Sequence, residues 1–364
     1  MPPLTQRTLN RTLLQRQFLL ARTSAVPPYD VIRRLVAVQA QEHNWPYVGL
    51  WTRIEGFAKD DLVRLLADRS VVRATMIRRT VHLAAAEDFR WLRPTVEPVV
   101  TAALRTAYFR PHLEGLDLDE LVAAGRELLA GRTLPRRELG ALLAERFPGR
   151  KAAMLQAGYE VLDPLVHPLP AGTWGGWNSR PVAVARAAEF TGTELADGPR
   201  FETMILRYLA AFGPATVMDL QSWAGVTRLR PAVEALRPRL RVLYDEDGRE
   251  LFDHPDAVLA DPDLPAPVRL LPAFDNVLQG HRDRARIIAE DDRRRTAKEA
   301  SAGVPMFLVD GFVRGEWRPV DEDTVRVRAY GPLTAAEEEA VRAEVARLSG
   351  LLGGAEPRVR WEQV

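Results

Sequence analysis

Cysteine is absent from this chain of 364 residues. Without thiols the protein cannot form disulfides, use a cysteine nucleophile, or bind zinc and iron–sulfur clusters through sulfur. Long apolar runs are absent too, since no stretch approaches the roughly 20 residues that span a membrane. The first residues also lack the basic-then-apolar pattern of a secretory signal. We therefore expect a soluble, cytoplasmic protein.

Recognisable cofactor and metal motifs are missing as well. The sequence contains no phosphate-binding Walker loop, no glycine-rich dinucleotide turn and no nucleophile elbow around a serine. Its six histidines are scattered between His43 and His281, and none form a pair with metal-ligand spacing. These absences argue against metal-dependent and dinucleotide chemistry, and we expect neither a metal ion nor a cofactor.

Lysine is scarce, since only Lys59, Lys151 and Lys298 accompany the many arginines. The net charge of +1 does not by itself indicate a polyanionic partner. Arginine binds phosphate in a bidentate manner and stacks on bases, which suits nucleic acid. A GC-rich genome explains the same bias through codon usage, and composition leaves both explanations open.

What the sequence does contain is a recurring helical pattern. Apolar residues at helical spacing predict three helices, over residues 8–21, 29–39 and 59–68. Two β-rich segments follow, at residues 71–77 and 80–83, and Arg78 and Arg79 join them. Three helices followed by a hairpin with a basic tip are typical of a winged helix, which presents one helix at the width of a DNA groove.

A similar order recurs twice. Helices are expected over residues 119–130, 135–146 and 152–165, before a turn-rich segment with exposed aromatic residues at 168–181. The third set has helices over residues 201–212, 216–224 and 228–236, and strands over 240–244 and 249–252. We therefore predict a mainly α, α+β fold with three tandem winged helices, here called the first, second and third units, over residues 1–93, 94–197 and 198–262.

The C-terminal region, residues 263–364, has a different character. Short strands are expected over residues 268–271, 306–309, 312–318 and 324–330, with Asp310 and Gly311 as a hairpin turn. A capping box from Thr334 to Glu337 begins a final helix over residues 334–352. This pattern predicts a small sheet with one helix packed on it.

Two glutamines one residue apart, Gln39 and Gln41, are not explained by their surroundings. Pro46 stops the predicted helix, so Gln39 is expected in or near its last turn and Gln41 just beyond it. If the chain is extended there, both side chains point to the same side and both amides can face one pocket. The alternative is that the amides cap the helix and satisfy loop carbonyls, and spacing alone does not exclude it.

The segment around these glutamines, residues 38–51, resembles the AlkZ family of bacterial DNA glycosylases. Further similar motifs cover essentially the whole chain, at residues 68–73, 79–83, 271–276, 280–284 and 309–318. The most diagnostic family motif is a glutamine, an apolar residue and a second glutamine, matched here by Gln39-Ala40-Gln41. Arg79 departs from the pattern, because many relatives have a glycine at that position.

The resemblance implies three winged helices around a concave DNA-binding face. It also implies a monofunctional glycosylase, acting as a monomer, that excises bulky N7-alkylated purines from duplex DNA and unhooks interstrand crosslinks. Gln41 implies this branch, because a related branch with aspartate there acts on a broader set of alkylated bases. The implied role is base excision repair that gives an antibiotic producer self-resistance, in the cytoplasm and at the nucleoid.

The chemistry of such a substrate agrees with a site built on amides. N7 alkylation gives the purine a positive charge, which makes it a good leaving group without a general acid. The enzyme must then position a water and tolerate an oxocarbenium-like sugar, and amide carbonyl oxygens suit both tasks. Ordinary glycosidases need paired carboxylates because their leaving groups are poor. We therefore predict that Gln39 and Gln41 are the catalytic residues.

A crosslinked base cannot flip out of the duplex, so the site should be open and approach the lesion in the groove. Candidates for the lesion pocket are Asn44, Trp45 and His82, although a core tryptophan and a buried histidine fit the same pattern. The candidate DNA contacts are basic residues: Arg73, Arg78, Arg79, Arg228, Arg230, His281, Arg284, Arg286 and Arg318.

Two groups of these contacts have alternatives. His281, Arg284 and Arg286 are expected on a turn or hairpin that reaches the minor groove or the phosphates. Surface ion pairs with Asp283 or Glu290 would explain them equally well. The arginines of the third unit fit a phosphate-binding surface, and they also fit the solvated face of a structural module.

The competing prediction is a non-catalytic winged-helix protein, either a transcription regulator or a drug-binding protein. A regulator binds one undamaged sequence tightly, whereas a glycosylase prefers lesions and shows little sequence choice. A glycosylase-derived module with another lesion chemistry is a third alternative, which the masses of the released products would reveal.

Overall fold

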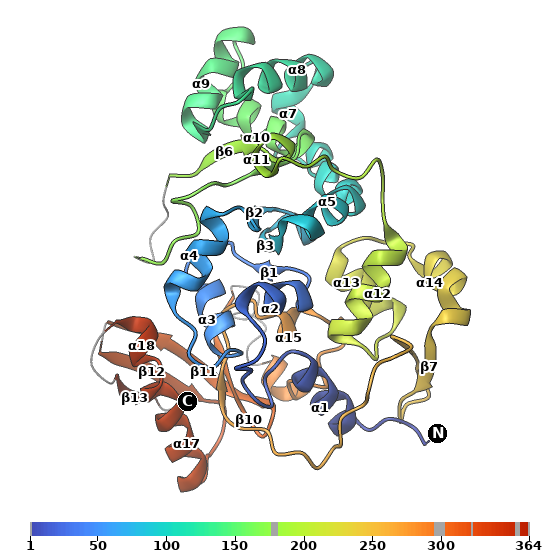
Figure 1. The fold of residues 1–364 in the computed structure, drawn as a ribbon, viewed down its shortest axis with the longest axis vertical. Coiled ribbons are helices and arrows are strands. Elements are labelled where there is room, and N and C mark those ends of the chain that lie inside the picture. Colours follow the sequence, from blue (N-terminus) through green and yellow to red (C-terminus); the bar gives the residue numbers. More distant parts are fainter. Residues whose placement is uncertain (1, 176–180, 295–302, 322, 354–356, 363–364) are drawn as a thin grey trace.

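The computed structural model describes residues 2–175, 181–294, 303–321, 323–353 and 357–362. Helices predominate and the strands form small, separate sheets (Figure 1), which confirms the predicted α+β, mainly α fold class. None of the helices in the described part of the chain combines the length and apolar composition needed to cross a membrane. The division into three winged helices stays a prediction.

The first unit folds around a three-stranded antiparallel sheet of order β1-β3-β2. Its elements are α1 (Gln6–Arg16), α2 (Pro28–Arg34), β1 (Val38–Gln39), α3 (Trp45–Trp51), α4 (Lys59–Ala67), β2 (Val71–Thr75), η1 (Ile77–Arg79) and β3 (Val81–Ala85). Helix α5 (Ala86–Thr95) leads into the second unit. The predicted hairpin is therefore present, with a third strand that the sequence pattern did not indicate.

The predicted helix over residues 29–39 is wrong in its second half. Helix α2 ends at Arg34, and Val36 has a φ of 66°, a left-handed conformation that ends the helix. Asn276, far along the chain, donates hydrogen bonds to the carbonyls of Leu35 (3.4 Å) and Ala37 (3.0 Å). The carbonyl oxygens of Leu35 and Ala37 therefore accept hydrogen bonds from a distant side chain instead of from a further helical turn. The chain beyond them is extended and pairs with β3 as β1.

Two other helices of the first unit also differ from expectation. The helix expected over residues 8–21 ends at Arg16, because Phe18 has a φ of 57°. Pro46 does not only stop a helix but begins a new one, α3, at a position where the missing N–H is not needed. The sequence pattern predicted neither α3 nor β1.

The second unit has its own hydrophobic core and its own small sheet of order β4-β6-β5. Its elements are α6 (Glu97–Thr101), η2 (Ala102–Arg105), α7 (Arg110–Leu113), α8 (Leu118–Leu129), β4 (Leu134–Pro135), α9 (Arg136–Arg146), α10 (Ala152–Leu162), β5 (Leu165–Val166), β6 (Ala183–Arg186) and α11 (Ala187–Thr191). Helix α10 is shorter than expected because Leu165 pairs with Arg186 in the sheet. Residues 176–180 of the expected aromatic loop, including Trp177, lie outside the described residues.

The third unit follows its prediction closely. Its elements are α12 (Phe201–Phe212), α13 (Val217–Ala224), α14 (Arg230–Leu236), η3 (Arg237–Arg239), β7 (Arg241–Tyr244) and β8 (Glu250–Asp253). Thr216 caps α13 and Gly225 ends it with a φ of 75°, as their residue types favour. Helix α14 begins two residues later than expected, because Arg228 has a φ of 61°.

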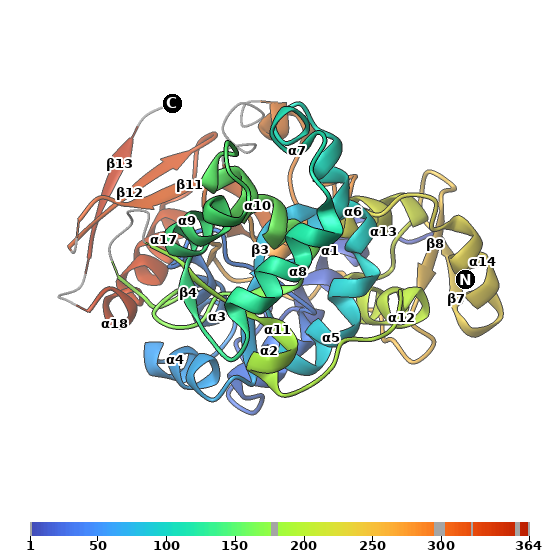
Figure 2. The same ribbon diagram turned by 90° about the horizontal axis from the view of Figure 1, so that it is seen from above.

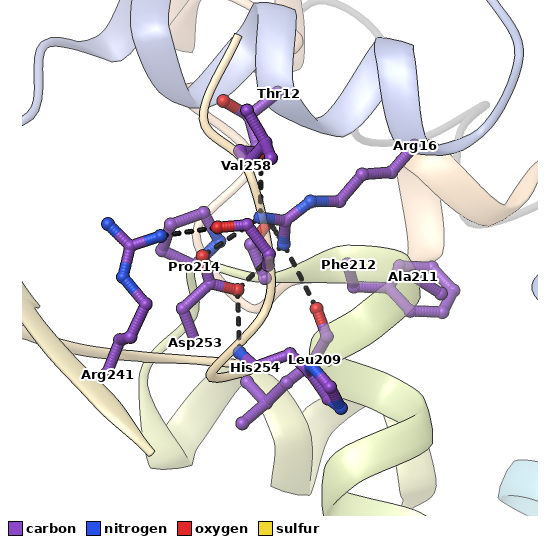
Figure 3. A network of polar contacts seen from close by, with 12 residues as sticks. Thr12, Arg16, Leu209, Ala211, Phe212, Pro214, Arg241, Asp253, His254 and Val258 are labelled. Carbon is purple, nitrogen blue, oxygen red and sulfur yellow. Dashed lines mark hydrogen bonds and ion pairs between the residues drawn. The ribbon is translucent and has the colours of Figure 1, made fainter.

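Helix α1 is fastened to the third unit by a buried ion pair. Figure 3 shows Arg16 reaching from α1 to Asp253 at the end of β8, where two hydrogen bonds of 2.8 and 2.9 Å join guanidinium and carboxylate. Arg16 also donates to the carbonyl of Leu209 at 3.1 Å. Nearby, the hydroxyl of Thr12 accepts a hydrogen bond from the backbone N–H of Ala260. The first and third units are thus held together by contacts between distant parts of the sequence.

The C-terminal region forms a five-stranded sheet of order β13-β12-β11-β10-β9. Its elements are β9 (Arg269–Leu270), α15 (Asn276–Gln279), β10 (Met306–Val309), β11 (Phe312–Pro319), β12 (Thr324–Ala329), α17 (Ala335–Ala346), α18 (Ser349–Leu352) and β13 (Arg358–Glu362). The turn at Asp310 and Gly311 and the capping box of Thr334 and Glu337 are confirmed. The last strand, β13, pairs parallel to β12 and was not predicted.

The parts pack around the first unit. One core joins its side chains to the C-terminal sheet, and another joins them to the third unit. Figure 2 shows the second unit lying over the first, between the third unit and the C-terminal sheet. The backbone N–H of His167, just after β5, donates to the carbonyl of Arg73 in β2 at 2.8 Å. The sheet that carries Gln39 is therefore contacted by every other part of the molecule.

Candidate active site and DNA-binding surface

Gln39 and His82 lie side by side on the small sheet of the first unit. They are direct partners in the β1–β3 ladder, and His82 is also the partner of Ala74 in β2. Directly opposed residues of an antiparallel pair share one face of the sheet. The N–H of Ala40 donates to the carbonyl of Val81 at 2.8 Å, so the extended conformation continues past Gln39.

The two glutamine amides are held differently. The Gln39 side chain is 8% exposed, and its amide has no hydrogen-bond partner in the described part of the chain. Gln41 is exposed, and its Oε1 accepts a hydrogen bond from the N–H of Val81 at 3.2 Å. The Gln41 amide therefore pairs with the backbone of β3, and neither glutamine caps the preceding helix, which ends at Arg34. Because buried polar groups are normally paired, the amide of Gln39 is the one left for a water or a substrate.

His82 is a neutral hydrogen-bonding group beside Gln39. Burial, together with the nearby Arg78 guanidinium, lowers the pKa of His82 to about 3. Its Nδ1 lies 2.9 Å from the carbonyl of Thr80, which can only accept, so Nδ1 carries the proton. The Nε2 atom is then an unprotonated acceptor at neutral pH.

Asn44, a predicted pocket residue, ties the loop at residues 171–175 to the first unit. Its Nδ2 donates to the carbonyl of Gly175 at 2.6 Å, and its Oδ1 accepts from the N–H of Gly175 at 3.0 Å. His43 accepts from the N–H of Gly172 at 2.8 Å, while the Tyr47 hydroxyl donates to the carbonyl of Gly172 at 2.9 Å. The residues that follow the two glutamines therefore hold a loop of the second unit beside the site.

Trp45 is half-buried and packs edge-to-face on Trp317 of β11, with ring centroids 6.0 Å apart. The Trp317 indole is itself anchored, because its Nε1 donates to the carbonyl of Leu271 at 2.9 Å. Trp45 thus joins the first unit to the C-terminal sheet. Arg318, the residue next to Trp317, is exposed on the same strand.

The three predicted DNA contacts of the first unit differ in exposure. Arg73 is 3% exposed and donates hydrogen bonds to the carbonyl of Ala40, so its position argues against a phosphate contact. Arg78 is half-buried, and burial lowers its pKa to about 10, with a smaller contribution from the Arg284 guanidinium. The Arg78 guanidinium also donates to the carbonyl of Trp223 in the third unit. Arg79, the next residue, is exposed.

Arg79 also accounts for the departure from the family pattern. Its φ is 61° and that of Arg78 is 52°, so both are in the left-handed region that favours glycine. A non-glycine residue pays roughly 1 kcal/mol there. The turn between β2 and β3 therefore keeps the conformation expected of a glycine, while its side chain places a cation at the tip.

The two predicted DNA contacts of the third unit are exposed to solvent. Arg228 is exposed and has no partner in the described residues, and the side chain of Arg230 is 65% exposed. Arg230 lies only 3.5 Å from Glu234 in an ion pair of the kind that contributes little when solvated. Both guanidinium groups are thus free to meet a phosphate.

His281 and Arg286 are buried, contrary to the expectation that they reach DNA. The Nε2 of His281 donates to the carbonyl of Phe212 at 3.0 Å, and burial lowers the pKa of His281 to about 3. Arg286 donates to the carbonyl of Pro214 at 2.9 Å. Both residues therefore fasten their turn to the third unit. Arg284, between them, is half-buried and remains a candidate contact beside Arg78.

The sequence analysis did not identify the buried residues whose hydrogen bonds hold the chain around β1 and α3. Arg53, two residues after the end of α3, forms a bidentate ion pair with Asp275, with distances of 2.9 and 2.8 Å, and both side chains are buried. The next residue, Asn276, holds the chain just before β1. Asp275 and Asn276 stand inside the motif at residues 271–276, so the motif was visible although its supporting role was not.

In the part of the chain that the structure describes, no three His, Asp or Glu side chains lie close enough to hold a metal ion. One cavity of about 520 Å³ lies between the third unit, α1 and the turn at residues 282–286, and neither Gln39 nor Gln41 lines it. The arrangement around Gln39 offers a neutral amide and a neutral imidazole, which can orient a water but cannot donate a proton strongly.

Comparison with known proteins gives consistent results. An interstrand DNA cross-link repair glycosylase from Streptomyces sahachiroi is 27% identical over 93% of this chain and 95% of its own length. The solved structure of the Streptomyces sahachiroi DNA glycosylase AlkZ has the same fold, with a TM-score of 0.80 at 23% identity over 99% of this chain and 100% of that one. The family model described as DNA glycosylase AlkZ-like matches residues 32–351. The chain is therefore a member of the AlkZ-like DNA glycosylase family.

Proposed function

We propose that this enzyme is a monofunctional glycosylase that hydrolyses the N-glycosidic bond of bulky N7-alkylated purines in duplex DNA, including those of interstrand crosslinks. The observation that carries the proposal is the unpaired, nearly buried amide of Gln39 beside the neutral His82. A catalytic site for a poor leaving group would need a carboxylic acid here. An alkylated purine already carries the positive charge that makes it leave.

The protein does not need to supply a general acid, because the alkylated purine is already a good leaving group. As the N9–C1′ bond breaks, its electron pair neutralises the charge of the purine and leaves an oxocarbenium-like sugar. A water held by the Gln39 carbonyl oxygen adds to C1′, and its surplus proton passes to solvent. Gln41, whose oxygen is bound by Val81, has its NH2 group available for the base or the sugar. Neutral amides add no ionisable group, so they tolerate the developing cation.

The DNA-binding surface that we propose combines exposed and half-buried arginines of several parts. It contains Arg78, Arg79, Arg228, Arg230, Arg284 and Arg318. Such a spread surface suits a duplex that is approached in its groove, and a crosslinked base requires that approach because it cannot flip out. We further propose that the protein acts as a monomer on chromosomal DNA in the cytoplasm. Its role would be self-resistance to a DNA-alkylating antibiotic.

The proposal is tested by incubating the purified protein with duplex DNA that carries N7-alkylguanine adducts of increasing size and one N7 crosslink. Mass spectrometry should detect the intact alkylated base, released faster than by spontaneous depurination in buffer. Replacing Gln39 with Ala should slow single-turnover release by about 100-fold or more, the usual cost of one positioned polar group. Gln41→Ala should also slow it, and Gln41→Asp tests whether charge is tolerated.

Glu42→Gln is the matched control, because Glu42 lies in the same loop and is exposed. Its rate should equal that of the wild type. No release by the wild-type protein would contradict the proposed activity, and unchanged rates in both glutamine variants would contradict the assigned residues. Tight binding to one undamaged sequence would instead favour a regulator.

A further inference from the structure

A buried arginine contacts the backbone between the two glutamines. Arg73 of β2 is 3% exposed, and its Nε and Nη2 donate to the carbonyl oxygen of Ala40 at 3.2 and 3.0 Å. Nη2 also lies 3.5 Å from the carbonyl oxygen of Gln41. The guanidinium therefore holds the carbonyl group at the centre of the Gln39-Ala40-Gln41 triplet.

This contact fixes the direction of Gln41. A peptide unit is planar, so the position of the Ala40 oxygen sets the whole plane that ends at the Cα of Gln41. The preceding plane is set by the N–H of Ala40, which donates to Val81 at 2.8 Å. Both peptide planes of Ala40 are thus held, one by β3 and the other by Arg73.

Arg73 acts from the opposite face of the sheet. Its ladder partner is Leu83, the neighbour of His82, so its side chain leaves the sheet on the side away from Gln39 and His82. It does not share the face on which we place the reacting groups. Any effect of Arg73 on catalysis must therefore pass through the backbone of the triplet.

The second unit holds the arginine in turn. Nη1 of Arg73 donates to Nδ1 of His167 at 2.8 Å, and Nε2 of His167 lies 2.9 Å from the carboxylate of Glu160. A neutral imidazole that accepts at Nδ1 donates at Nε2, so Arg73, His167 and Glu160 form one directional chain. The Arg136 guanidinium, whose Nη2 lies 3.0 Å from the same Nε2, pairs with the Glu160 carboxylate. Burial alone would raise the pKa of Glu160, but His167 and Arg136 lower it to about 2. The chain thus ends on a carboxylate that stays ionised.

We propose that Arg73 is a positioning residue for the Gln39-Ala40-Gln41 triplet, and that His167 and Glu160 of the second unit hold it in register. This inference rests on the proposed function of the two glutamines. It assigns the second unit a part in the chemistry, although none of its own side chains is expected at the lesion. A small displacement of a positioned group costs a large factor in rate, so the contact should matter for turnover more than for DNA binding.

The test compares two pairs of variants. Arg73→Met keeps the length of the side chain and removes its donors, whereas Arg73→Lys keeps the charge and cannot bridge Ala40 and His167 together. His167→Leu removes both hydrogen bonds, whereas His167→Gln can still accept from Arg73 and donate to Glu160. We expect single-turnover release to fall about 100-fold in Arg73→Met and about 10-fold in His167→Leu, and to recover mostly in His167→Gln, with unchanged DNA affinity.

The control is Arg126→Met, which breaks another ion pair of the second unit, with the buried Asp163, and touches neither the triplet nor Arg73. It should lower stability without slowing release. Hydrogen–deuterium exchange of residues 38–42 gives a readout that does not depend on activity, and it should rise in Arg73→Met and not in Arg126→Met.

Each outcome decides the inference. Wild-type rate and wild-type exchange in Arg73→Met and Arg73→Lys would overturn it. Equal rates for His167→Gln and His167→Leu would contradict the part of the inference in which His167 and Glu160 hold Arg73 in register. If the wild-type protein released no base but Arg73→Met still loosened residues 38–42, the proposed function would fail while the positioning contact stood.

Discussion

Arg73 of the first unit is buried, Arg78 is half-buried, and both donate to backbone carbonyls, whereas Arg228 and Arg230 of the third unit are exposed. The same residue type therefore serves two purposes in units with similar local structure. In the first unit Arg73 holds the backbone between two amides, and Arg78 donates to the carbonyl of Trp223 in the third unit. In the third unit it is available to neutralise phosphates. An arginine-rich sequence by itself does not reveal which purpose applies.

The sheets of the first and third units also differ, in how many other parts of the molecule they contact. The three strands of the first unit pack against the second unit, the third unit and the C-terminal sheet. The β7–β8 hairpin of the third unit has only two strands and lies at one side of the molecule (Figure 1). The geometry around Gln39 thus depends on contacts with the rest of the chain, whereas the ends of helix α13 in the third unit are set by neighbouring residues.

The largest expected effect on stability comes from breaking the buried ion pair between Arg53 of the first unit and Asp275 of the C-terminal region. Arg53→Met leaves the buried carboxylate of Asp275 without its partner and should cost about 3–5 kcal/mol in the free energy of unfolding. The comparison is Arg239→Met in the third unit, whose ion pair with Glu202 is exposed and should contribute about 1 kcal/mol or less. Urea unfolding measures both. Equal losses would show that the two units are stabilised alike.

A smaller effect is expected from pH, through the buried imidazole of His82. The unfolded chain binds a proton at the usual histidine pKa, whereas the folded chain does so only near pH 3. Acid therefore favours the unfolded state, and the stability that is present above about pH 6.5 is progressively lost towards pH 3. His82 alone should account for about 2 kcal/mol between pH 6.5 and pH 5.

The check is urea unfolding of the wild type and of His82→Gln at both pH values. The variant should lose less stability on acidification than the wild type. Equal losses in the two proteins would mean that His82 is protonated in the folded protein. They would contradict the assignment of an unprotonated Nε2 beside Gln39.

The smallest expected effect is on the third unit. Arg228→Ala and Arg230→Ala should leave stability unchanged, because neither guanidinium has a buried partner. Each should weaken binding to any duplex and reduce the slope of log affinity against log salt concentration by about 1. Binding titrations at several salt concentrations provide the measurement. An unchanged slope in both variants would remove the third unit from the DNA-binding surface.

Local sequence signals predicted the third unit well because its helix ends are determined nearby. Thr216 caps α13, Gly225 ends it, and α12 has the predicted bounds. The segment before Gln39 was predicted less well, because Asn276 and β3 hold it from far along the chain. Periodicity cannot report such contacts.

The candidate site shows the same division. Gln39 and Gln41 were chosen from the sequence because they match a family motif, and their extended conformation was one of two open alternatives. Their unequal environments depend on Val81 and His82, which only the folded sheet brings beside them. The sequence suggests that His281 and Arg286 are surface groups. In the structure both are buried and donate hydrogen bonds to carbonyls of the third unit. No spacing rule distinguishes a phosphate ligand from an arginine that binds a carbonyl.

The assignment of chemistry to Gln39 and of DNA binding to Arg228 and Arg230 is tested most directly by a single-turnover titration. Release of an N7-alkylated base is followed at increasing enzyme concentration for Gln39→Ala and for the Arg228→Ala, Arg230→Ala double variant. We predict that Gln39→Ala lowers the limiting rate and keeps the half-saturating concentration. The double variant should raise that concentration and reach the wild-type limiting rate. The account would be contradicted if both variants changed the same parameter, or if Gln39→Ala reached the wild-type rate.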